Sequence, residues 1–296
     1  MFNSEFFLAK LYLFFTNSKT QIIISTCAVI CIFAAEIFIL GYKKSSIANI
    51  TRGDVSSRKD LLSYILDLTG LLRIIGHALT LGIGYLIGQL INKYLNLDVT
   101  KSFTNPIFQI VFFLVAKSFF DYWMHRFMHQ SPALWEIHKY HHSATEMNVV
   151  TAHRESVLVA PWSSLYFAVP LGILGSPVTT LLLVGFFIEI HALLIHSQFK
   201  FSFGKFGEYF LISPKAHLIH HSLALEHRDV NFGFLFSFWD HIFGTYKINS
   251  SNEPVRIGVE DEIYNNASWL KEQTHGVRSF VMHLFKPERK AAKRAV

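Results

Sequence analysis

Charged residues and cysteine are both scarce in this sequence. Only 16% of its 296 residues are Asp, Glu, Lys or Arg, whereas 51% are hydrophobic, and the mean hydropathy is +0.32. The chain is therefore too apolar for an ordinary soluble domain, although it is long enough to bury a sizeable core. Its only cysteines, Cys27 and Cys31, lie in one apolar run, where a disulfide along a single helix face would have poor geometry. We interpret both as small core or lipid-facing residues.

Several motifs of common cofactor sites are missing as well. No GxGxxG follows a strand, as NAD(P) or flavin binding would require, and no His-Pro-Gly-Gly pattern indicates a fused haem domain. No HExxH is present, which disfavours a zinc hydrolase. The formal charge of +6 lies partly in the C-terminal KPERKAAKRAV, and aromatic and basic residues do not alternate. We therefore expect no nucleic-acid partner.

Histidine, in contrast, is abundant and clustered. Residues 121–154 read DYWMHRFMHQSPALWEIHKYHHSATEMNVVTAHR, and residues 213–233 read SPKAHLIHHSLALEHRDVNFG. Residues three or four apart share one face of a helix, so each segment predicts converging imidazoles. Imidazole is a common ligand of zinc, copper, iron and nickel. The sequence therefore predicts a metal site, with candidate ligands in one HxxxH and two HxxHH motifs: His125, His129, His138, His141, His142, His217, His220 and His221.

Five apolar segments predict an all-α integral membrane protein. They cover residues 21–41, 71–91, 106–124, 157–175 and 177–195, and the bilayer core takes about 20 helical residues. Proline and glycine punctuate the last two, which favours a helical hairpin that is kinked or does not fully cross. Since a hairpin returns the chain to the face it left, both histidine-rich segments lie on one side. We expect a membrane helical bundle with a histidine-rich helical cap that holds a dimetal site.

The loop charges indicate which side this is. Residues 42–70 contain five Lys or Arg, whereas residues 92–105 contain only Lys93 and Lys101. Basic loops favour the cytoplasm, so we expect the N-terminus outside and the cap, the active site and the basic tail on the cytoplasmic face of a multi-pass protein.

Residues between and after the clusters add further candidates. Glu189 lies in an apolar run, where it either orients a ligand imidazole or bonds to a neighbouring helix. His196 shares its face and lies at the cytoplasmic end, so it is a better ligand candidate than His191. Asp229 and Asn231 follow the last cluster and either support the metal ligands or form a turn.

The succession HRFMH, HKYHH and HLIHH, ending in NFGFLFSFWDHIFGTY, resembles the fatty acid hydroxylase/sterol desaturase superfamily. The segments HHSATEMNVVTAHRESVL and LLIHS are similar to its alkylglycerol monooxygenase branch, although His153 and Glu155 replace the apolar residue and the amide expected there. On this resemblance, residues 1–105 form N-terminal membrane spans and loops, residues 106–247 the catalytic domain, and residues 248–296 a basic cytosolic tail.

The resemblance also implies the chemistry. It implies an O2-dependent monooxygenase that hydroxylates a sterol, fatty acyl or alkylglycerol lipid. From their places in the sequence, Glu189, Asp229 and Asn231 are our catalytic candidates. The cofactor is then two iron ions (Fe2+/Fe3+), although the same ligands would suit zinc. Since no reductase motif is present, the electrons must come from a separate reductase, cytochrome or ferredoxin. The implied ligands are His125, His129, His138, His141, His142, His196, His217, His220 and His221.

Other classes are consistent with part of this pattern. A lipid desaturase would use the same di-iron site and yield a double bond instead of an alcohol. A membrane metal transporter also combines spans with histidines, but transporters place their ligands near the membrane midplane, whereas these lie mainly just after span ends.

Overall fold

The computed structural model describes residues 4–71, 83–95, 99, 103, 105–175, 178–248 and 254–285. Within these ranges every regular element is a helix, and the only β-pairing is an isolated bridge between Ser222 and Ile257. The predicted all-α class is confirmed.

Among the residues that the structure describes, two helices are long and apolar enough, by length and composition, to cross a membrane. They are α1 (Ser4–Leu40), through its stretch Ile22–Leu40, and α6 (Pro106–Gln130). The apolar stretches of α8 (Val159–Leu174) and α9 (Val178–Ile195) are shorter. Most of the predicted span 71–91 lies outside the described residues, and its last part belongs to α5 (Ile83–Leu95).

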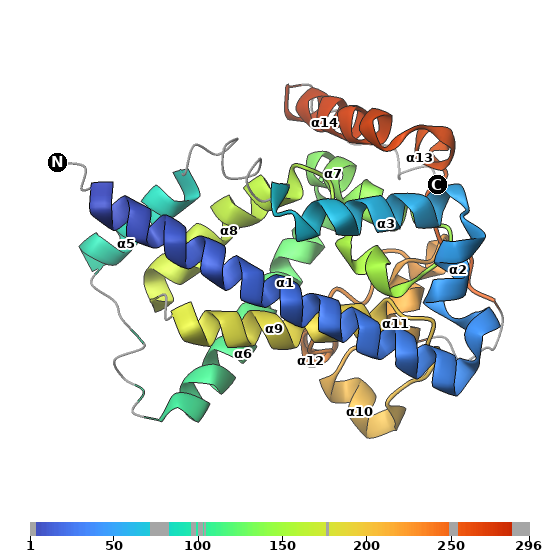
Figure 1. Cartoon of the computed structure of the whole chain (residues 1–296), viewed down its shortest axis with the longest axis horizontal. Helices are drawn as coiled ribbons and strands as arrows, with labels where there is room; N and C mark the ends of the chain where they lie inside the picture. The colour runs from blue at the N-terminus through green and yellow to red at the C-terminus, as the bar shows by residue number, and fades with distance from the viewer. Residues whose placement is uncertain are drawn as a thin grey trace.

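Helices α5 and α8 lie at one end of the molecule, and α1 runs from that end across to α2 (Ser46–Arg52) (Figure 1). Helix α1 runs beside α9, α9 also contacts α6, and α5 packs against α8 (Figure 1). Glycine permits the last contact, because a Cβ added at Gly172 of α8 would lie 2.9 Å from the carbonyl oxygen of Gly88 of α5. Small residues let membrane helices approach closely.

The other end is a cap of short helices and loops around the histidines (Figure 1). Its two histidine-bearing helices, α7 (Pro132–His142) and α11 (Pro214–His220), begin in the same way. Ser131 and Ser213 accept hydrogen bonds from the backbone N–H groups of Leu134 and Ala216, and a proline follows each serine. Serine at the N-cap and proline at the first helical position are favoured helix starts. The remaining cap helices are η1 (Tyr42–Lys44), α2 (Ser46–Arg52), α3 (Val55–Leu68), η3 (Val149–His153), α10 (Gly204–Phe210), η4 (Leu225–His227), α12 (Phe238–Ile242), α13 (Glu262–Asn266) and α14 (Trp269–Phe285).

The polar region 42–70 is helical and partly buried against the cap. Arg154 is completely buried, and its guanidinium lies 2.7 Å from the carboxylate of Asp60 in α3, which is also completely buried. The same guanidinium donates to the carbonyl oxygen of Tyr140 at 2.9 Å, near the end of α7. Arg154 therefore fastens α3 to the helix that carries the HxxHH motif at 138–142.

The C-terminal helix closes on α7 from another direction. Helix α14 packs along α7, where Gly276 leaves room for the backbone of Glu136: a Cβ there would lie 3.1 Å from its carbonyl oxygen. Buried Lys59 of α3 pairs with buried Glu272 of α14. Segments from both ends of the chain thus hold α7 in place.

The buried ion pair yields a stability prediction. Asp60→Ala leaves the Arg154 guanidinium buried without its carboxylate, so we expect a loss of about 3–5 kcal/mol of folding free energy. Glu146→Ala removes an exposed partner that lies 3.6 Å from Arg52, and it should cost less than about 1 kcal/mol. Unfolding in mixed detergent micelles, followed by circular dichroism, measures both changes. Equal losses in the two variants would contradict the role given to Arg154.

Candidate metal centre

Nine buried histidines gather inside the cap in two groups. In each group the imidazole nitrogens that could serve as ligands all lie within 4.8 Å of one another. The structure thus brings together all nine histidines predicted as ligands, and no other described histidine joins them. The first group is His125, His129, His138, His142 and His220, and the second group is His141, His196, His217 and His221.

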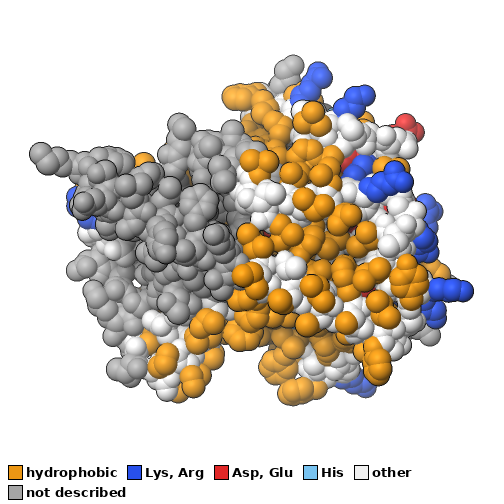
Figure 2. All heavy atoms as spheres, in the orientation of Figure 1, with side chains coloured by type: hydrophobic (Ala, Val, Ile, Leu, Met, Phe, Trp, Pro, Cys, Tyr) orange, Lys and Arg blue, Asp and Glu red, His pale blue; other side chains and the backbone are white. Residues whose placement is uncertain are grey.

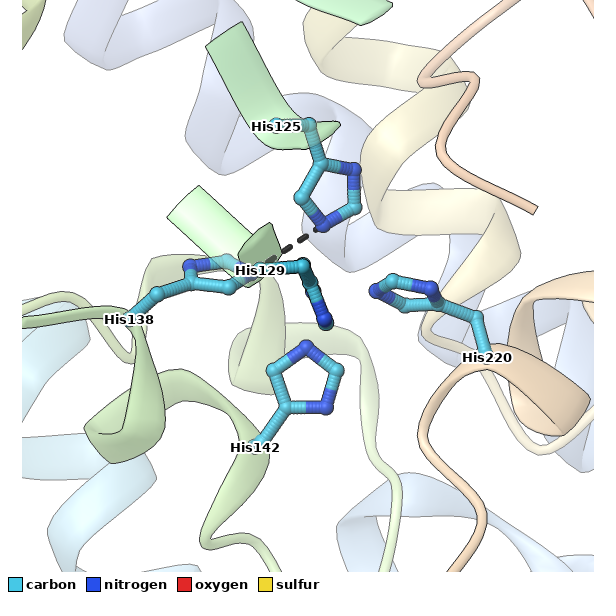
Figure 3. Close-up of side chains that lie close together, drawn as sticks. All are labelled: His125, His129, His138, His142 and His220. Atoms are coloured by element: carbon cyan, nitrogen blue, oxygen red, sulfur yellow. Dashed lines mark hydrogen bonds between the residues drawn. The ribbon is translucent and has the colours of Figure 1, made fainter. Parts of the chain in front are cut away.

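The first group draws its rings from three helices. His125 and His129 come from the end of α6, His138 and His142 from α7, and His220 from the end of α11. Figure 3 shows the five rings pointing toward one centre. The Nε2 atoms of His125 and His138 lie 3.0 Å apart.

Backbone carbonyls determine which ring nitrogen faces that centre. The Nδ1–H of His125 donates to the carbonyl oxygen of Phe232 at 2.8 Å, and that of His220 donates to Val230 at 2.7 Å. Each bond places the proton on Nδ1 and leaves Nε2 with a lone pair. A hydrogen bond of this kind fixes the tautomer and orientation of a metal-binding imidazole.

The second group is built in the same way around His196, which directly follows α9. Its Nδ1–H donates to the carbonyl oxygen of Ala192 at 2.7 Å, so its Nε2 is unprotonated. That Nε2 lies 3.0 Å from Nε2 of His217 and 3.3 Å from Nε2 of His141. Nε2 of His221 completes the group, 3.1 Å from that of His217.

Burial keeps these rings neutral. Loss of hydration lowers the pKa of His138, His142 and His217 well below the usual histidine range, and neighbouring imidazoles lower it further. The same two causes lower the pKa of His141 and His221. Neutral imidazole is the form that binds a metal ion.

The geometry of both groups fits a metal ion. Nitrogen ligands lie about 2.0–2.1 Å from an ion such as zinc, so two ligands at right or tetrahedral angles lie about 2.9–3.4 Å apart. The observed Nε2 separations of 3.0 to 3.3 Å fall in this range. The buried Nε2 atoms of His142 and His220 also have no hydrogen-bond partner among the described residues. An unpaired buried acceptor is costly, and a bound cation would satisfy it.

The aspartate of the FWDHIFGT segment supports the first group indirectly, through the backbone of the residue that bonds to His125. Buried Asp240 accepts hydrogen bonds from the backbone N–H groups of Phe232 at 2.7 Å and Gly233 at 2.9 Å, and from the Thr245 hydroxyl at 2.7 Å. Burial nevertheless raises the pKa of Asp240 to about 6. Glycine is required at 233, because a Cβ there would lie 2.4 Å from the carbonyl oxygen of Phe236. Asp240 therefore fixes the carbonyl that orients His125, a role that the sequence motif alone did not reveal.

The structure gives the two polar candidates of the DVN segment different surroundings. Asp229 and Asn231 both have left-handed backbones, with φ of 57° and 56°, as expected of turn-forming Asp and Asn. An Asp229 carboxylate oxygen lies 3.8 Å from Nδ1 of His129. The Asn231 amide is fully buried and bonds instead to the backbone, donating to Ala216 at 2.9 Å and accepting from Lys247 at 2.8 Å. Asn231 thus positions α11 without touching a candidate ligand.

Three further residues, Glu189, His191 and His153, belong to neither group. Glu189 lies in α9, and no hydrogen bond joins it to any of the nine histidines. Nε2 of His191 donates to the carbonyl oxygen of Ile212 at 2.8 Å. His153 pairs with Asp67 at 3.0 Å.

Glu155, the other departure from the alkylglycerol monooxygenase pattern, lies beside the second group. One of its carboxylate oxygens is 3.9 Å from Nδ1 of His141. Burial raises the pKa of Glu155 to about 8. The resemblance to the branch marks Glu155 as a departure, but only the structure shows that its side chain lies beside His141.

A cavity of about 820 Å³ opens onto the first group. Its inner wall includes His129, His142, His220 and Trp135, and Leu284 of α14 lines its outer part. Its size is within the usual range for small-molecule sites.

Comparison with known proteins identifies the domain that contains these groups. Residues 110–245 match the family model described as "Fatty acid hydroxylase". The chain is 28% identical over 156 residues to the ornithine lipid hydroxylase OlsE of Rhizobium tropici. The matched region covers 53% of this chain and 47% of that protein. The predicted resemblance to the fatty acid hydroxylase/sterol desaturase superfamily is thereby confirmed.

The particular relatives include the predicted branch. The chain is 32% identical over 154 residues to the alkylglycerol monooxygenase of Homo sapiens and 34% identical over 151 residues to that of Danio rerio. These matches cover 52% and 51% of this chain and 33% of each relative. The chain thus spans between a third and about half of the length of these curated relatives. No solved structure matches it.

The grouping predicts how metal content responds to a single ligand. His141→Ala removes one of the four candidate ligands of the second group, so we expect bound metal to fall from about two ions per chain to about one. His283→Ala, outside both groups, should leave the metal content unchanged. Elemental analysis of the purified variants measures this. Full metal content in His141→Ala would show that the second group does not bind an ion.

The support by Asp240 is tested separately. Asp240→Asn places an amide where the backbone N–H groups of Phe232 and Gly233 require an acceptor, so the Phe232 carbonyl should lose its fixed position. We expect metal affinity to fall about 10- to 100-fold. Competition with a chelator measures the affinity.

Asp54→Asn is the matched control for this change, because Asp54 caps α3 away from both groups. It should leave the chelator competition unchanged even if it lowers the melting temperature. An equal loss of metal affinity in both variants would refute a positioning role for Asp240.

Proposed function

We propose that this protein is a membrane-bound di-iron monooxygenase that hydroxylates a lipid with O2 and external electrons. The observation that carries the proposal is the pair of neutral histidine groups inside a segment that matches the fatty acid hydroxylase family. Two iron ions held there would supply the oxidising power needed to attack an unactivated C–H bond.

The described residues have clear tasks in this scheme. The first group has five candidate ligands and the second has four, which can hold two ions and still leave positions open, as catalytic metal sites require. The carbonyls of Phe232, Val230 and Ala192 hold three of the rings in the metal-binding tautomer. Asp229 lies near the outer nitrogen of His129, where a carboxylate can increase the basicity of a ligand imidazole, and Glu155 lies near the outer nitrogen of His141, where its carboxyl group can orient the ring.

The cavity beside the first group offers a place for the substrate. It extends from the Trp135 indole and His142 to Leu284 of α14, so one end is at the candidate metal centre. The apolar helices α6, α8 and α9 lie next to the cap, and a membrane lipid could therefore reach it. We infer a multi-pass protein with its centre on the cytoplasmic face, as the basic loop at 42–70 favours.

The relatives support a lipid substrate of one of two kinds. They act on ornithine lipids or alkylglycerols, according to their names. On an alkylglycerol, hydroxylation of the carbon next to the ether oxygen gives a hemiacetal, which collapses to an aldehyde and glycerol. On an acyl chain or a sterol, the product is a stable alcohol. In either case a separate reductase, cytochrome or ferredoxin supplies the electrons.

The reaction is tested with labelled oxygen. Purified protein loaded with ferrous iron, given a reductase system and mixed membrane lipids, should incorporate ¹⁸O from ¹⁸O2 into a lipid product or the aldehyde derived from it, as detected by mass spectrometry. His141→Ala should lose at least about 100-fold in rate, because an altered metal site loses its activity. Equal product formation without O2 would exclude an oxygenase. Label found only in water, together with a new double bond, would identify a desaturase.

A further inference from the structure

A second cavity, of about 640 Å³, lies where α1 ends. Its walls come from the end of α1, from α2, from residues 145–147 and from the segment that follows α9. None of the nine clustered histidines lines it. We call this cavity, with its rim Lys43, Lys44, Arg52 and Lys200, the basic hollow.

The rim of the basic hollow is strongly cationic. Four Lys or Arg side chains line it, and Glu146 is the only carboxylate among the described residues around it. Arg52 lies 3.6 Å from Glu146, and both side chains are exposed. The other three cations form no ion pair with any described residue. Such a rim favours an anionic ligand.

The cations come from parts of the sequence that lie far apart. Lys43 and Lys44 directly follow α1, whereas Lys200 follows α9. Figure 2 shows Lys and Arg side chains along the edge of the molecule where α1 ends and α2 lies, next to a broad hydrophobic face. The fold therefore assembles the rim at the boundary between apolar and charged surface.

Part of the lining, which we call the floor of the hollow, is apolar, and it lies beside the polar side chains of Asn49, Thr145, Ser197 and Gln198. Leu40, the last residue of α1, lines it together with Ile195, Phe199 and Leu218. Ile195 and Phe199 are buried. A free phosphate ion would gain nothing from such a floor, whereas a phospholipid carries its phosphate next to apolar chains.

We propose that the basic hollow binds the headgroup of an anionic phospholipid. The lysines surround the phosphate, and the beginning of the acyl chains lies against Leu40 and Phe199. Because α1 has just emerged from its apolar stretch at Leu40, the rim lies at headgroup depth. The site is separate from the metal centre, so its occupancy does not depend on bound metal or on the proposed reaction.

The test compares the protein with the variant Lys43→Gln/Lys44→Gln/Lys200→Gln. Each cation near an anionic lipid surface strengthens binding about fivefold, so three neutralisations should weaken it about 100-fold at low salt. Detergent-solubilised full-length chain is titrated with dioleoyl phosphatidylglycerol, dioleoyl phosphatidylcholine and inorganic phosphate. Bound lipid is counted by native mass spectrometry, and the melting temperature is measured alongside.

Two control variants separate the hollow from general charge effects. Lys205→Gln/Lys271→Gln/Arg278→Gln removes the same charge from exposed positions that do not line the hollow, and it should change phosphatidylglycerol affinity less than about threefold. Lys43→Arg/Lys44→Arg/Lys200→Arg keeps the charge and should retain binding.

The expected result is tight binding of phosphatidylglycerol alone, lost only in the Lys→Gln variant of the hollow. Equal binding of phosphatidylcholine, equal protection by inorganic phosphate, or equal loss in the distant Lys→Gln variant would each overturn the proposal. Should the Lys→Gln variant of the hollow not fold, loss of binding in the Lys→Arg variant would overturn it as well. Absence of metal or of oxygenase activity would leave the lipid result unaffected.

Discussion

Nine neutral imidazoles share one buried space, and within each group their nitrogens face one another, as close as 3.0 to 3.3 Å. Nitrogens this close either share a proton in an N–H···N hydrogen bond or bind a common cation, and the buried Nε2 atoms of His142 and His220, which have no hydrogen-bond partner among the described residues, favour the cation. The fold of the cap brings these nine rings together, because the ends of α6, α7, α9 and α11 all lie at one place. A metal centre therefore explains both the burial of the rings and the convergence of the helices.

The supporting contacts come from outside the histidine motifs. Backbone carbonyls at 192, 230 and 232 orient one ring each, and Asp240 holds the loop that contains two of them. On the other side, Arg154 and Asp60 fasten α7 to a helix that precedes it by more than 60 residues. These contacts keep the imidazole rings in fixed orientations, because ligand side chains that are free to move lose the geometry that a metal ion requires.

The sequence was sufficient for the helical class and for the histidines that gather in the cap, because HxxxH and HxxHH spacings, which include eight of the nine, follow directly from helix periodicity. His196, the ninth, was predicted from its place at the end of an apolar segment and from the family resemblance. The division of the nine into five and four could not be predicted, since it depends on how α6, α7 and α11 pack. Region 42–70 appeared to be a polar loop, but the partner of Asp60 is 94 residues away, beyond the reach of local patterns. Glu189 was a candidate because it is a charge in an apolar run, and it belongs to neither group of histidines, so its role stays a prediction.

Anomalous diffraction from crystals of the iron-loaded protein tests most directly whether the two groups hold two separate ions. Data collected just above and just below the iron absorption edge should show two peaks within the cap, one enclosed by His125, His129, His138, His142 and His220 and the other by His141, His196, His217 and His221. A single peak, or two peaks away from these rings, would contradict the account.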